Sequence, residues 1–332
     1  MSALKSKKRA LLIYDASLGS TKLKQVESLL SSNVDIIEVY SLEYGSKDLQ
    51  KVDEIWQQMI RFHPDVAVAL GGGTVCDLVG FASSCYHRGL DHIFFPTTLL
   101  SMVDACIGGK TGIDYRGVKN SIGQVHYAVD SYCAFEFLDT LEYSELISGF
   151  SEVIKAGMLF EEELLAKIEK LNSTFSMTDE WFEVVSRGAE LKALMSEQLL
   201  SQRSRLLYGH NVGHGIETYD DTHRRHGDCV AIGMNIELAL AVAGGLVDRK
   251  VWHRQQKILN KFNLTDRLPI GMEFSKIKDK MKLYKLYKNG EYLFVIPKKP
   301  GTIIRNNGDY YWHLTEKDLD ILWPKALKLI NQ

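Results

Sequence analysis

The apolar run DVAVAL at Asp65–Leu70 leads directly into the sequence GGGTVCD at Gly71–Asp77. The first part predicts a buried strand, and the glycines predict a tight turn into a helix. Glycines let the backbone approach a phosphate closely, and the start of a helix offers unpaired N–H groups to it. The segment therefore predicts a phosphate-binding loop, with a simple tight turn as the alternative. It lacks the GxGxxG fingerprint of common dinucleotide sites.

Strands and helices alternate on both sides of this segment. The expected strands are Arg9–Tyr14, Val34–Tyr40, Asp65–Leu70 and His92–Phe95, and the expected helices are Lys22–Leu30 and Leu49–Phe62. Such alternation predicts an α/β fold with a Rossmann-like, doubly wound parallel sheet.

The pattern changes near Thr140 and becomes mostly helical. The clearest expected helices are Glu142–Leu171, Glu180–Leu200 and Gly227–Ala243, and Tyr292–Pro297 is expected to form a short strand pair. We therefore predict two domains, an α/β domain over 1–141 and a mostly α-helical domain over 142–332.

The bulk composition excludes several classes of protein. The net charge of −2 gives no electrostatic basis for binding nucleic acid or a membrane surface. No window reaches the roughly 18 apolar residues that a membrane span needs. The five cysteines are an odd number without a CxxC pair, which indicates reduced thiols in a cytoplasmic protein.

A second group of residues has the character of a divalent-metal site. The sequence GHNVGH places His210 and His214 on one helix face, and His226 follows shortly after. Two or three histidines and a carboxylate make a catalytic metal site. The best carboxylate is Glu152, which lies in an apolar stretch with Lys155 three residues on. The alternative is that Glu152 and Lys155 form an exposed ion pair.

The stretch from Arg88 to Asn120 is dense in groups that bind anions and hydroxyls. It contains Arg88-Gly89, Pro96-Thr97-Thr98, Asp104, Gly108-Gly109-Lys110-Thr111-Gly112 and Lys119-Asn120. Lysines beside glycine loops commonly hold phosphate, so the stretch indicates a small phosphorylated substrate. Asp15, at the end of the first strand, is interpreted either as a contact to a ribose hydroxyl or as a helix cap.

Taken in order and spacing, these motifs resemble the 3-dehydroquinate synthase family of the sugar-phosphate cyclase superfamily. The residues that carry the likeness are Gly71–Asp77, Arg88-Gly89, Pro96–Leu100, Asp104, Gly108–Gly112, Lys119-Asn120, Glu152–Lys155, Gly209–His214 and His226–Asp228. The resemblance runs from about Leu70 to Met234, with a weaker extension to Lys285. It implies a phosphate-eliminating lyase that closes a carbocycle by transient oxidation, β-elimination, reduction and aldol addition.

The resemblance also implies roles for individual residues. Zinc, with cobalt as a possible substitute, is expected on Glu152, His210 and His226. NAD contacts are expected from Asp15, Gly72, Gly73, Asp77, Thr97, Thr98, Asp104, Lys110, Lys119 and Thr140. Catalytic and substrate contacts are expected from Arg88, Asp104, Lys110, Asn120, Lys155, Lys192, Arg203, His214 and Lys285. His214 is then a phosphate contact instead of a metal ligand, and the family implies a homodimer.

The chain departs from the family pattern at two places near the substrate. Leu207 stands where the family has an asparagine, and the segment from Lys192 to Arg203 is shortened. A cyclase of sedoheptulose 7-phosphate, forming a valiolone, or of glucose 6-phosphate, forming 2-deoxy-scyllo-inosose, is therefore an alternative. A metal-dependent NAD polyol dehydrogenase and a non-catalytic relative are the others, although Lys110, Asn120 and Lys155 argue against the dehydrogenase.

Overall fold

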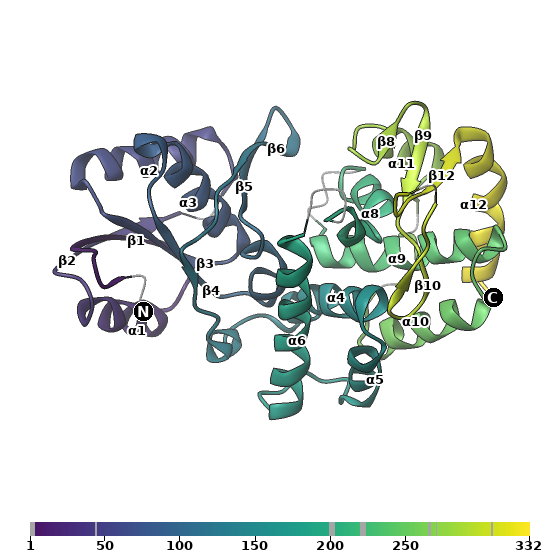
Figure 1. Cartoon of the computed structure of the whole chain (residues 1–332), viewed down its shortest axis with the longest axis horizontal. Helices are drawn as coiled ribbons and strands as arrows, with labels where there is room; N and C mark the ends of the chain where they lie inside the picture. Colours follow the sequence, from purple (N-terminus) through teal and green to yellow (C-terminus); the bar gives the residue numbers. More distant parts are fainter. Residues whose placement is uncertain are drawn as a thin grey trace. The chain divides into compact units, whose positions relative to one another are not determined.

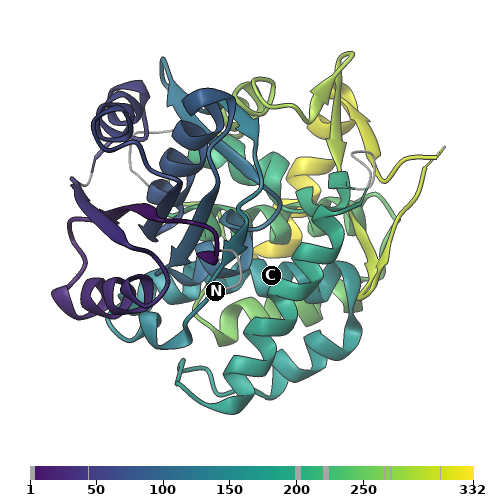
Figure 2. The ribbon, with the colours of Figure 1, turned by 60° about the vertical axis from the view of Figure 1, so that its left-hand side comes forward.

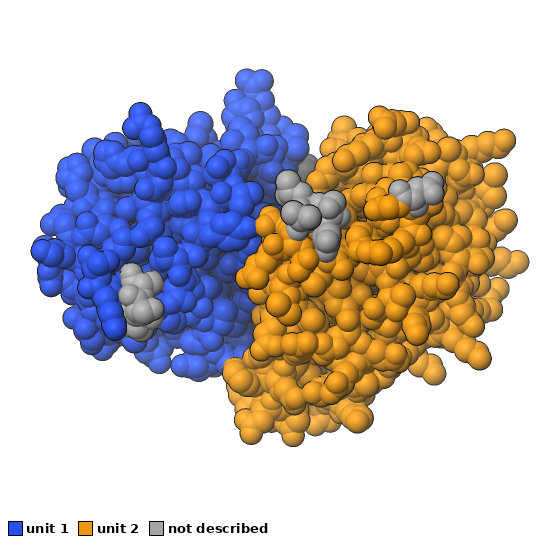
Figure 3. Space-filling model, in the orientation of Figure 1, with its two compact units in different colours: residues 1–142 blue, residues 143–332 orange. Residues whose placement is uncertain are grey.

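The computed structural model describes residues 4–43, 45–198, 203–219, 224–264, 267–269, 271–306 and 308–332. The chain forms two compact units, Met1–Glu142 and Tyr143–Gln332 (Figure 3).

The core of unit 1 is a parallel sheet with the strand order β2-β1-β3-β4-β7. Its strands are β1 (Arg9–Asp15), β2 (Ile36–Leu42), β3 (Val66–Gly71), β4 (His92–Pro96) and β7 (Asp130–Ser131). All six residues of β3 are buried, as the apolar run predicts for a central parallel strand. β2 lies two residues later than expected, and β7 was not predicted, because two residues carry no periodicity.

Helices cover both faces of this sheet. In two views, α1 (Ser20–Ser31) lies on one face, whereas α2 (Leu49–Phe62) and α3 (Gly73–Cys85) lie on the other (Figures 1 and 2). Leu11, Ile13 and other inward residues of the strands pack into one apolar cluster with residues of α2 and α3. The predicted doubly wound, Rossmann-like α/β fold is therefore confirmed.

An antiparallel hairpin of β5 (Lys110–Tyr115) and β6 (Val118–Val125) replaces the ordered loops expected around Lys110 and Lys119. That expectation was wrong because the glycines here serve strand pairing. Gly112 pairs with Gly123, where an added Cβ would lie 2.2 Å from the carbonyl oxygen of Thr111. Short helices among the described residues of this unit lie at Tyr86–Arg88, Ser101–Ala105 and Phe135–Leu138.

Unit 2 is mostly helical. Its helices are α4 (Tyr143–Phe160), α5 (Glu162–Lys170), α6 (Asp179–Ser196), α8 (His210–Glu217), α9 (His226–Ala243), α10 (Arg249–Lys261), α11 (Phe274–Met281) and α12 (Glu316–Ile330), with a short turn of helix at Ser204–Leu207. The apolar helix α9 is central and packs against α4, α8, α10 and α12. Among the described residues it is the one helix long and apolar enough to span a membrane, and 78% of it is buried in the fold.

Some predicted elements of this unit differ from the structure. The single helix expected at Glu142–Leu171 is broken at the extended residue Glu161 into α4 and α5, because the apolar pattern continues across the break and hides it. The expected end of the next helix, Leu200, lies outside the described residues. The strand pair expected at Tyr292–Pro297 was wrong.

The strands of unit 2 pair with more distant partners than expected. β9 (Glu291–Phe294) pairs with β8 (Tyr287–Lys288) and with β12 (Trp312–Thr315), while β10 (Pro297–Lys299) pairs with β11 (Thr302–Ile303). The partner strand β12 follows β9 by nearly twenty residues, a separation that alternation within a short window cannot indicate.

Candidate active site

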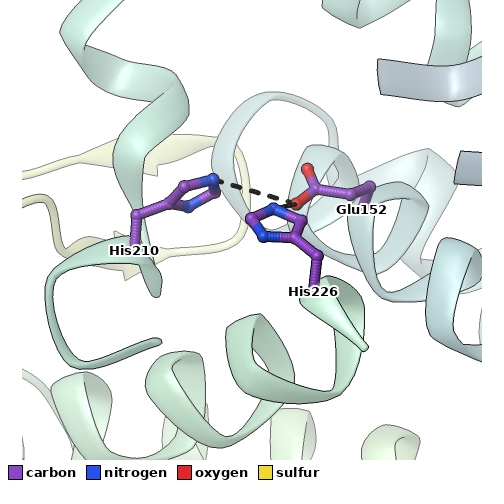
Figure 4. A group of neighbouring side chains, drawn as sticks. All are labelled: Glu152, His210 and His226. Carbon is purple, nitrogen blue, oxygen red and sulfur yellow. Dashed lines mark ion pairs between the residues drawn. The ribbon is translucent and has the colours of Figure 1, made fainter. Parts of the chain in front are cut away.

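Three ligand-type side chains meet in unit 2, each from a different helix (Figure 4). Glu152 lies within α4, whereas His210 and His226 are the first residues of α8 and α9. Oε1 of Glu152 lies 4.0 Å from Nε2 of His210 and 3.8 Å from Nε2 of His226. Within the described residues, each of these three side chains offers one candidate ligand atom, and the three atoms all lie within 4.8 Å of one another.

The donors and their surroundings fit a divalent metal. Glu152 is buried, and its Oε1 has no hydrogen-bond partner among the described residues. Burial, the Lys155 charge and the neighbouring histidines lower the pKa of His210, so its ring is neutral and keeps a lone pair for a metal. In a tetrahedral site, ligand atoms about 2 Å from zinc lie about 3.3 Å apart, so the 3.8 and 4.0 Å separations here would have to close slightly around the ion. Two imidazoles and one carboxylate also leave a position for substrate.

Both imidazole rings are oriented through their Nδ1 atoms. Nδ1 of His210 lies 3.0 Å from the carbonyl oxygen of Tyr208. Nδ1 of His226 lies 3.2 Å from Oε2 of Glu217. Each oxygen is an acceptor, so each Nδ1 carries the hydrogen and each Nε2 lone pair faces Glu152.

Lys155 lies beside the three ligand-type residues. It is one turn along α4 from Glu152, and its Nζ forms an ion pair with Oε2 of Glu152. Both side chains are 2% exposed, so the pair lies on a buried face of the helix. The ammonium group thus compensates one carboxylate oxygen and leaves the other to face the histidines.

His214 lies one turn along α8 from His210 and outside the ligand-type group. Its Nδ1 lies 3.5 Å from Oε2 of Glu217, and its ring lies against Tyr284, with 4.0 Å between centroids. Tyr284 was not predicted, because no sequence pattern connects it to His214.

Two lysines of unit 2 influence one another. Lys192 is buried on α6. Desolvation and the Lys192 charge lower the pKa of Lys285, which places the two cations in one neighbourhood where an anion would stabilise both. Arg203 makes a local hydrogen bond, in which its Nε donates to the carbonyl oxygen of Gln198 at 3.2 Å. Leu207, at the end of the short helix before α8, is half-buried.

The glycine loop of unit 1 lies at the carboxyl ends of β3 and β4. α3 starts at Gly73 after the N-cap Gly72, which has no side chain to cap the helix. An added Cβ at Gly72 would lie 3.1 Å from Cγ2 of Thr98. Thr97 is buried, with its N–H donating to the carbonyl oxygen of Gly71 at 2.9 Å. These residues therefore gather where open parallel sheets bind ligands.

Asp15 ends β1 and lies at the same edge of the sheet. Its Oδ1 accepts from the N–H and the hydroxyl of Ser17, at 2.9 and 2.7 Å. Asp15 also lines a small pocket with Thr74 and Val75 from the start of α3. One carboxylate oxygen thus stabilises the local turn, while the residue still borders the glycine loop. The helix-cap interpretation was wrong, because the N-cap of the next helix, α1, is Gly19.

A cluster around Lys47 was missed by the sequence interpretation. Nζ of Lys47 lies 2.8 Å from Oδ2 of Asp77 and also donates to Oδ1 of Asn120. Desolvation raises the pKa of Asp77, against the opposing effect of Lys47, and the Asp104 charge raises it further. The cluster brings together three predicted site residues. The available signal was a Gly-Glu-x-x-Lys segment of the family, which has only a partial counterpart at Glu43–Lys47.

Four other predicted residues of unit 1 lie on elements other than the glycine loop. Thr140 accepts a hydrogen bond from Lys22 of α1. Arg88 is exposed beyond the last turn of α3, and a 13-residue helix places it about 20 Å from the loop. Lys110 and Lys119 are exposed on the β5–β6 hairpin.

Comparisons with known proteins cover most of the chain. The sequence model of the 3-dehydroquinate synthase N-terminal region matches residues 38–148, and that of the C-terminal region matches residues 149–286. A 3-dehydroquinate synthase of Helicobacter pylori (strain ATCC 700392 / 26695) is 34% identical over 308 residues, which cover 90% of this chain and 88% of that protein.

Two solved structures share the fold closely. A 2-deoxy-scyllo-inosose synthase complexed with carbaglucose-6-phosphate, NAD+ and Co2+ has a TM-score of 0.86 at 17% identity, covering 96% of this chain and 91% of that one. A 2-epi-5-epi-valiolone synthase from Streptomyces hygroscopicus subsp. jinggangensis 5008, with NAD+ and Zn2+ bound, has a TM-score of 0.86 at 23% identity, covering 99% and 92%. At these identities the likeness concerns the fold.

Proposed function

The chain belongs to the 3-dehydroquinate synthase family, and we propose that it is an NAD- and zinc-dependent sugar-phosphate cyclase that forms 3-dehydroquinate. The predicted family is confirmed, and with it the expectation of an enzyme of the phosphate-eliminating lyase class. The observation that carries the proposal is the group of Glu152, His210 and His226 with Lys155 against it. It lies in the region that the C-terminal family model matches.

The cofactors follow from the two sites. When bound, NAD takes up and returns a hydride, while zinc or cobalt polarises the substrate hydroxyl that is transiently oxidised. We assign zinc to Glu152, His210 and His226. We assign the NAD pyrophosphate to Gly72 and Gly73, where a glycine backbone can approach it closely.

The chain's own residues supply binding and charge compensation. Lys155 neutralises one oxygen of Glu152 and places a cation at the reacting end of the sugar. Lys192 and Lys285, whose charges repel one another, are relieved by an anionic group of the substrate. The Nδ1 of His214 lies against Glu217, and we assign its Nε2 to a phosphate oxygen of the substrate. These interactions hold the phosphate in position for elimination, which is mainly a positioning effect.

The remaining assignments extend these. The α/β domain, predicted as 1–141, is assigned to NAD, and the helical domain, predicted as 142–332, to zinc and the sugar phosphate. A homodimer and a cytoplasmic location stay predictions. Arg88, Lys110, Lys119, Thr140 and Arg203 keep their predicted roles as proposals that the contacts of each unit do not yet support.

One observation favours a different sugar phosphate. Leu207 is apolar and half-buried where the family has an asparagine, so it cannot donate a hydrogen bond to phosphate. The second candidate is therefore a cyclase of sedoheptulose 7-phosphate or glucose 6-phosphate.

A substrate panel separates these functions. The protein is incubated with NAD and zinc and with each of three substrates: the 3-deoxy-heptulosonate 7-phosphate, sedoheptulose 7-phosphate and glucose 6-phosphate. We expect phosphate release from the heptulosonate without net NADH. Phosphate release from one of the other sugars would show that this sugar is the substrate instead. NADH accumulating with product would identify a polyol dehydrogenase, and no release from any would contradict the cyclase.

The metal assignment has a test of its own. We expect Glu152→Gln to abolish stoichiometric zinc binding, because it removes the charged ligand and keeps the shape. It should also lower the free energy of unfolding, because the buried Lys155 loses its counter-charge. Zinc content after dialysis and urea unfolding measure the two effects. Glu145→Gln, an exposed position on the same helix, is the matched control. Normal zinc content in Glu152→Gln would remove Glu152 from the site.

A further inference from the structure

Glu217 connects two histidines that the proposed chemistry uses separately. It is the last residue of α8, and its side chain is 7% exposed. A single oxygen, Oε2, lies 3.2 Å from Nδ1 of His226 and 3.5 Å from Nδ1 of His214. The carboxylate therefore accepts a hydrogen bond from Nδ1 of His226 and makes a longer ion-pair contact with Nδ1 of His214.

The two imidazole ligands are oriented by different means. His210 donates to a backbone carbonyl, that of Tyr208, which any residue at that position would supply. His226 donates to a side chain, Glu217, from a different helix. Orientation of the second ring thus depends on one replaceable carboxylate. A carboxylate behind a ligating histidine fixes the ring and its tautomer, and losing it typically weakens metal binding 10- to 100-fold.

The spacing along α8 adds a second consequence. His210, His214 and Glu217 follow one another at intervals of four and three residues, so they lie on one face of the helix. A displacement of the Glu217 carboxylate would therefore release the ring of His214 together with that of His226.

We propose that Glu217 is a positioning residue that holds His226 with Nε2 toward the metal and His214 with Nε2 toward the sugar phosphate. The part that concerns His214 rests on the proposed function. The part that concerns His226 needs only the metal.

The test is a Co2+ titration of metal-depleted full-length protein, followed by the visible spectrum of the ion, without NAD or sugar phosphate. We expect Glu217→Ala to bind Co2+ 10- to 100-fold more weakly. Glu217→Gln keeps an acceptor oxygen and should recover part of this loss. Asp228→Asn removes a carboxylate two residues from His226 that pairs with Arg225 instead, and should stay within about twofold of wild type.

Two outcomes would overturn the proposal. Unchanged affinity in Glu217→Ala would show that His226 needs no such support. An equal loss in Asp228→Asn would assign the effect to the general loss of negative charge. If Glu217→Ala fails to fold, 15N shifts of the histidine rings in metal-free wild type decide. The hydrogen is expected on Nδ1 of His226, and a hydrogen on Nε2 would contradict the proposal.

The outcome of this titration does not depend on the proposed function, because the titration contains no substrate. A protein that cyclises none of the three sugars could still show the Glu217 effect on Co2+. If the cyclase activity is found, Glu217→Ala should also raise KM for the sugar phosphate at saturating metal, which a purely structural role in the metal site would leave unchanged.

Discussion

Two of the helices that begin after a glycine use their first turns in opposite ways. In unit 1, α3 follows Gly72, and no cap from that residue fills the start of the helix. In unit 2, α8 follows Gly209, and a buried carboxylate of α9 occupies the start. Glu237 accepts from the N–H groups of Gly209 and Val212 at 2.8 and 3.0 Å.

The difference decides what each helix start can bind. The first turn of a helix attracts anions through its unpaired N–H groups. At α8 the side chain of Glu237, which is fully buried, already accepts hydrogen bonds from these N–H groups. The start of α8 therefore holds His210, the first residue of the helix, in place. At α3 the N-cap Gly72 offers no such group, and we propose that the donors of this first turn bind the phosphate of the cofactor. A glycine before a helix does not distinguish these uses.

The two glycines also differ in their surroundings. An added Cβ at Gly209, where φ is +76°, would lie 2.6 Å from Cγ of Met234 and 2.8 Å from the carbonyl oxygen of Val230. At Gly72 the backbone is extended, and the nearest atom to an added Cβ is 3.1 Å away. Gly209 is thus required for packing of α8 on α9, whereas Gly72 leaves space on the ligand side.

The largest expected effect is that of Gly209→Ala on stability. Left-handed strain of about 1–3 kcal/mol adds to overpacking of about 1–3 kcal/mol, so we expect a loss of about 3 kcal/mol or more in urea unfolding. Gly245→Ala is the control, because Gly245 has φ +75° with no atom within 4 Å of an added Cβ. Gly245→Ala should lose only the stability that the left-handed strain costs, without the overpacking contribution. Equal losses in the two variants would show that packing against α9 is not decisive.

The next effect is that of Glu237→Ala. Two buried N–H groups lose their acceptor, at about 1–3 kcal/mol each, so we expect a loss of about 2–6 kcal/mol in the free energy of unfolding. Zinc affinity should fall as well, because His210 begins the same turn. A variant with wild-type stability would indicate that water replaces the carboxylate and that the start of α8 is accessible to ligands.

A smaller effect should appear in the pH dependence. Burial raises the pKa of Glu237 to about 8, although three backbone N–H groups oppose it, and the facing Tyr208 has its pKa raised as well. Between its ordinary pKa and 8, the folded state holds more protons at this site than the unfolded state. Stability of wild type relative to Glu237→Gln should therefore fall as the pH rises from 6 to 8, by about 1–2 kcal/mol.

Urea unfolding of both proteins in a metal chelator measures this difference. Other titrating groups are common to the two proteins and cancel. A difference that stays flat from pH 6 to 8 would mean that the carboxylate is ionised in the folded state throughout this range and that the N–H donors dominate.

The smallest effect on stability is expected for Gly72→Ala, below about 1 kcal/mol, because Thr98 can shift by a few tenths of an ångström. NAD affinity, measured by calorimetry, should nevertheless fall by about tenfold, since the added methyl group lies where the backbone approaches the pyrophosphate. Unchanged NAD affinity would mean that the two helix starts do not differ in function.

Much of unit 1 could be predicted from local pattern. The helix Leu49–Phe62 has the bounds expected from its periodicity, and the buried strand β3 follows from its apolar run. The β5–β6 hairpin could not be predicted, because its glycines resemble a loop and act by allowing two strands to approach. The break at Glu161 was hidden for the corresponding reason, since the apolar pattern crosses it.

The candidate site also has residues that the sequence could predict and residues that it could not. The residue types of Glu152, His210 and His226 and their likeness to a known family were evident in the chain alone, because motifs of local spacing survive in sequence. Lys47, Tyr284 and Glu217 were not, since their partners lie on other elements.

The sequence by itself determined the alternation of strands and helices, the glycine loop and the residues able to bind a metal, since periodicity and side-chain chemistry are local properties. Only the tertiary structure decided which glycine-started helix keeps its donors. Glu237 lies 28 residues from Gly209 along the chain, and the packing of α9 against α8 brings that carboxylate to one helix start and to no other described here.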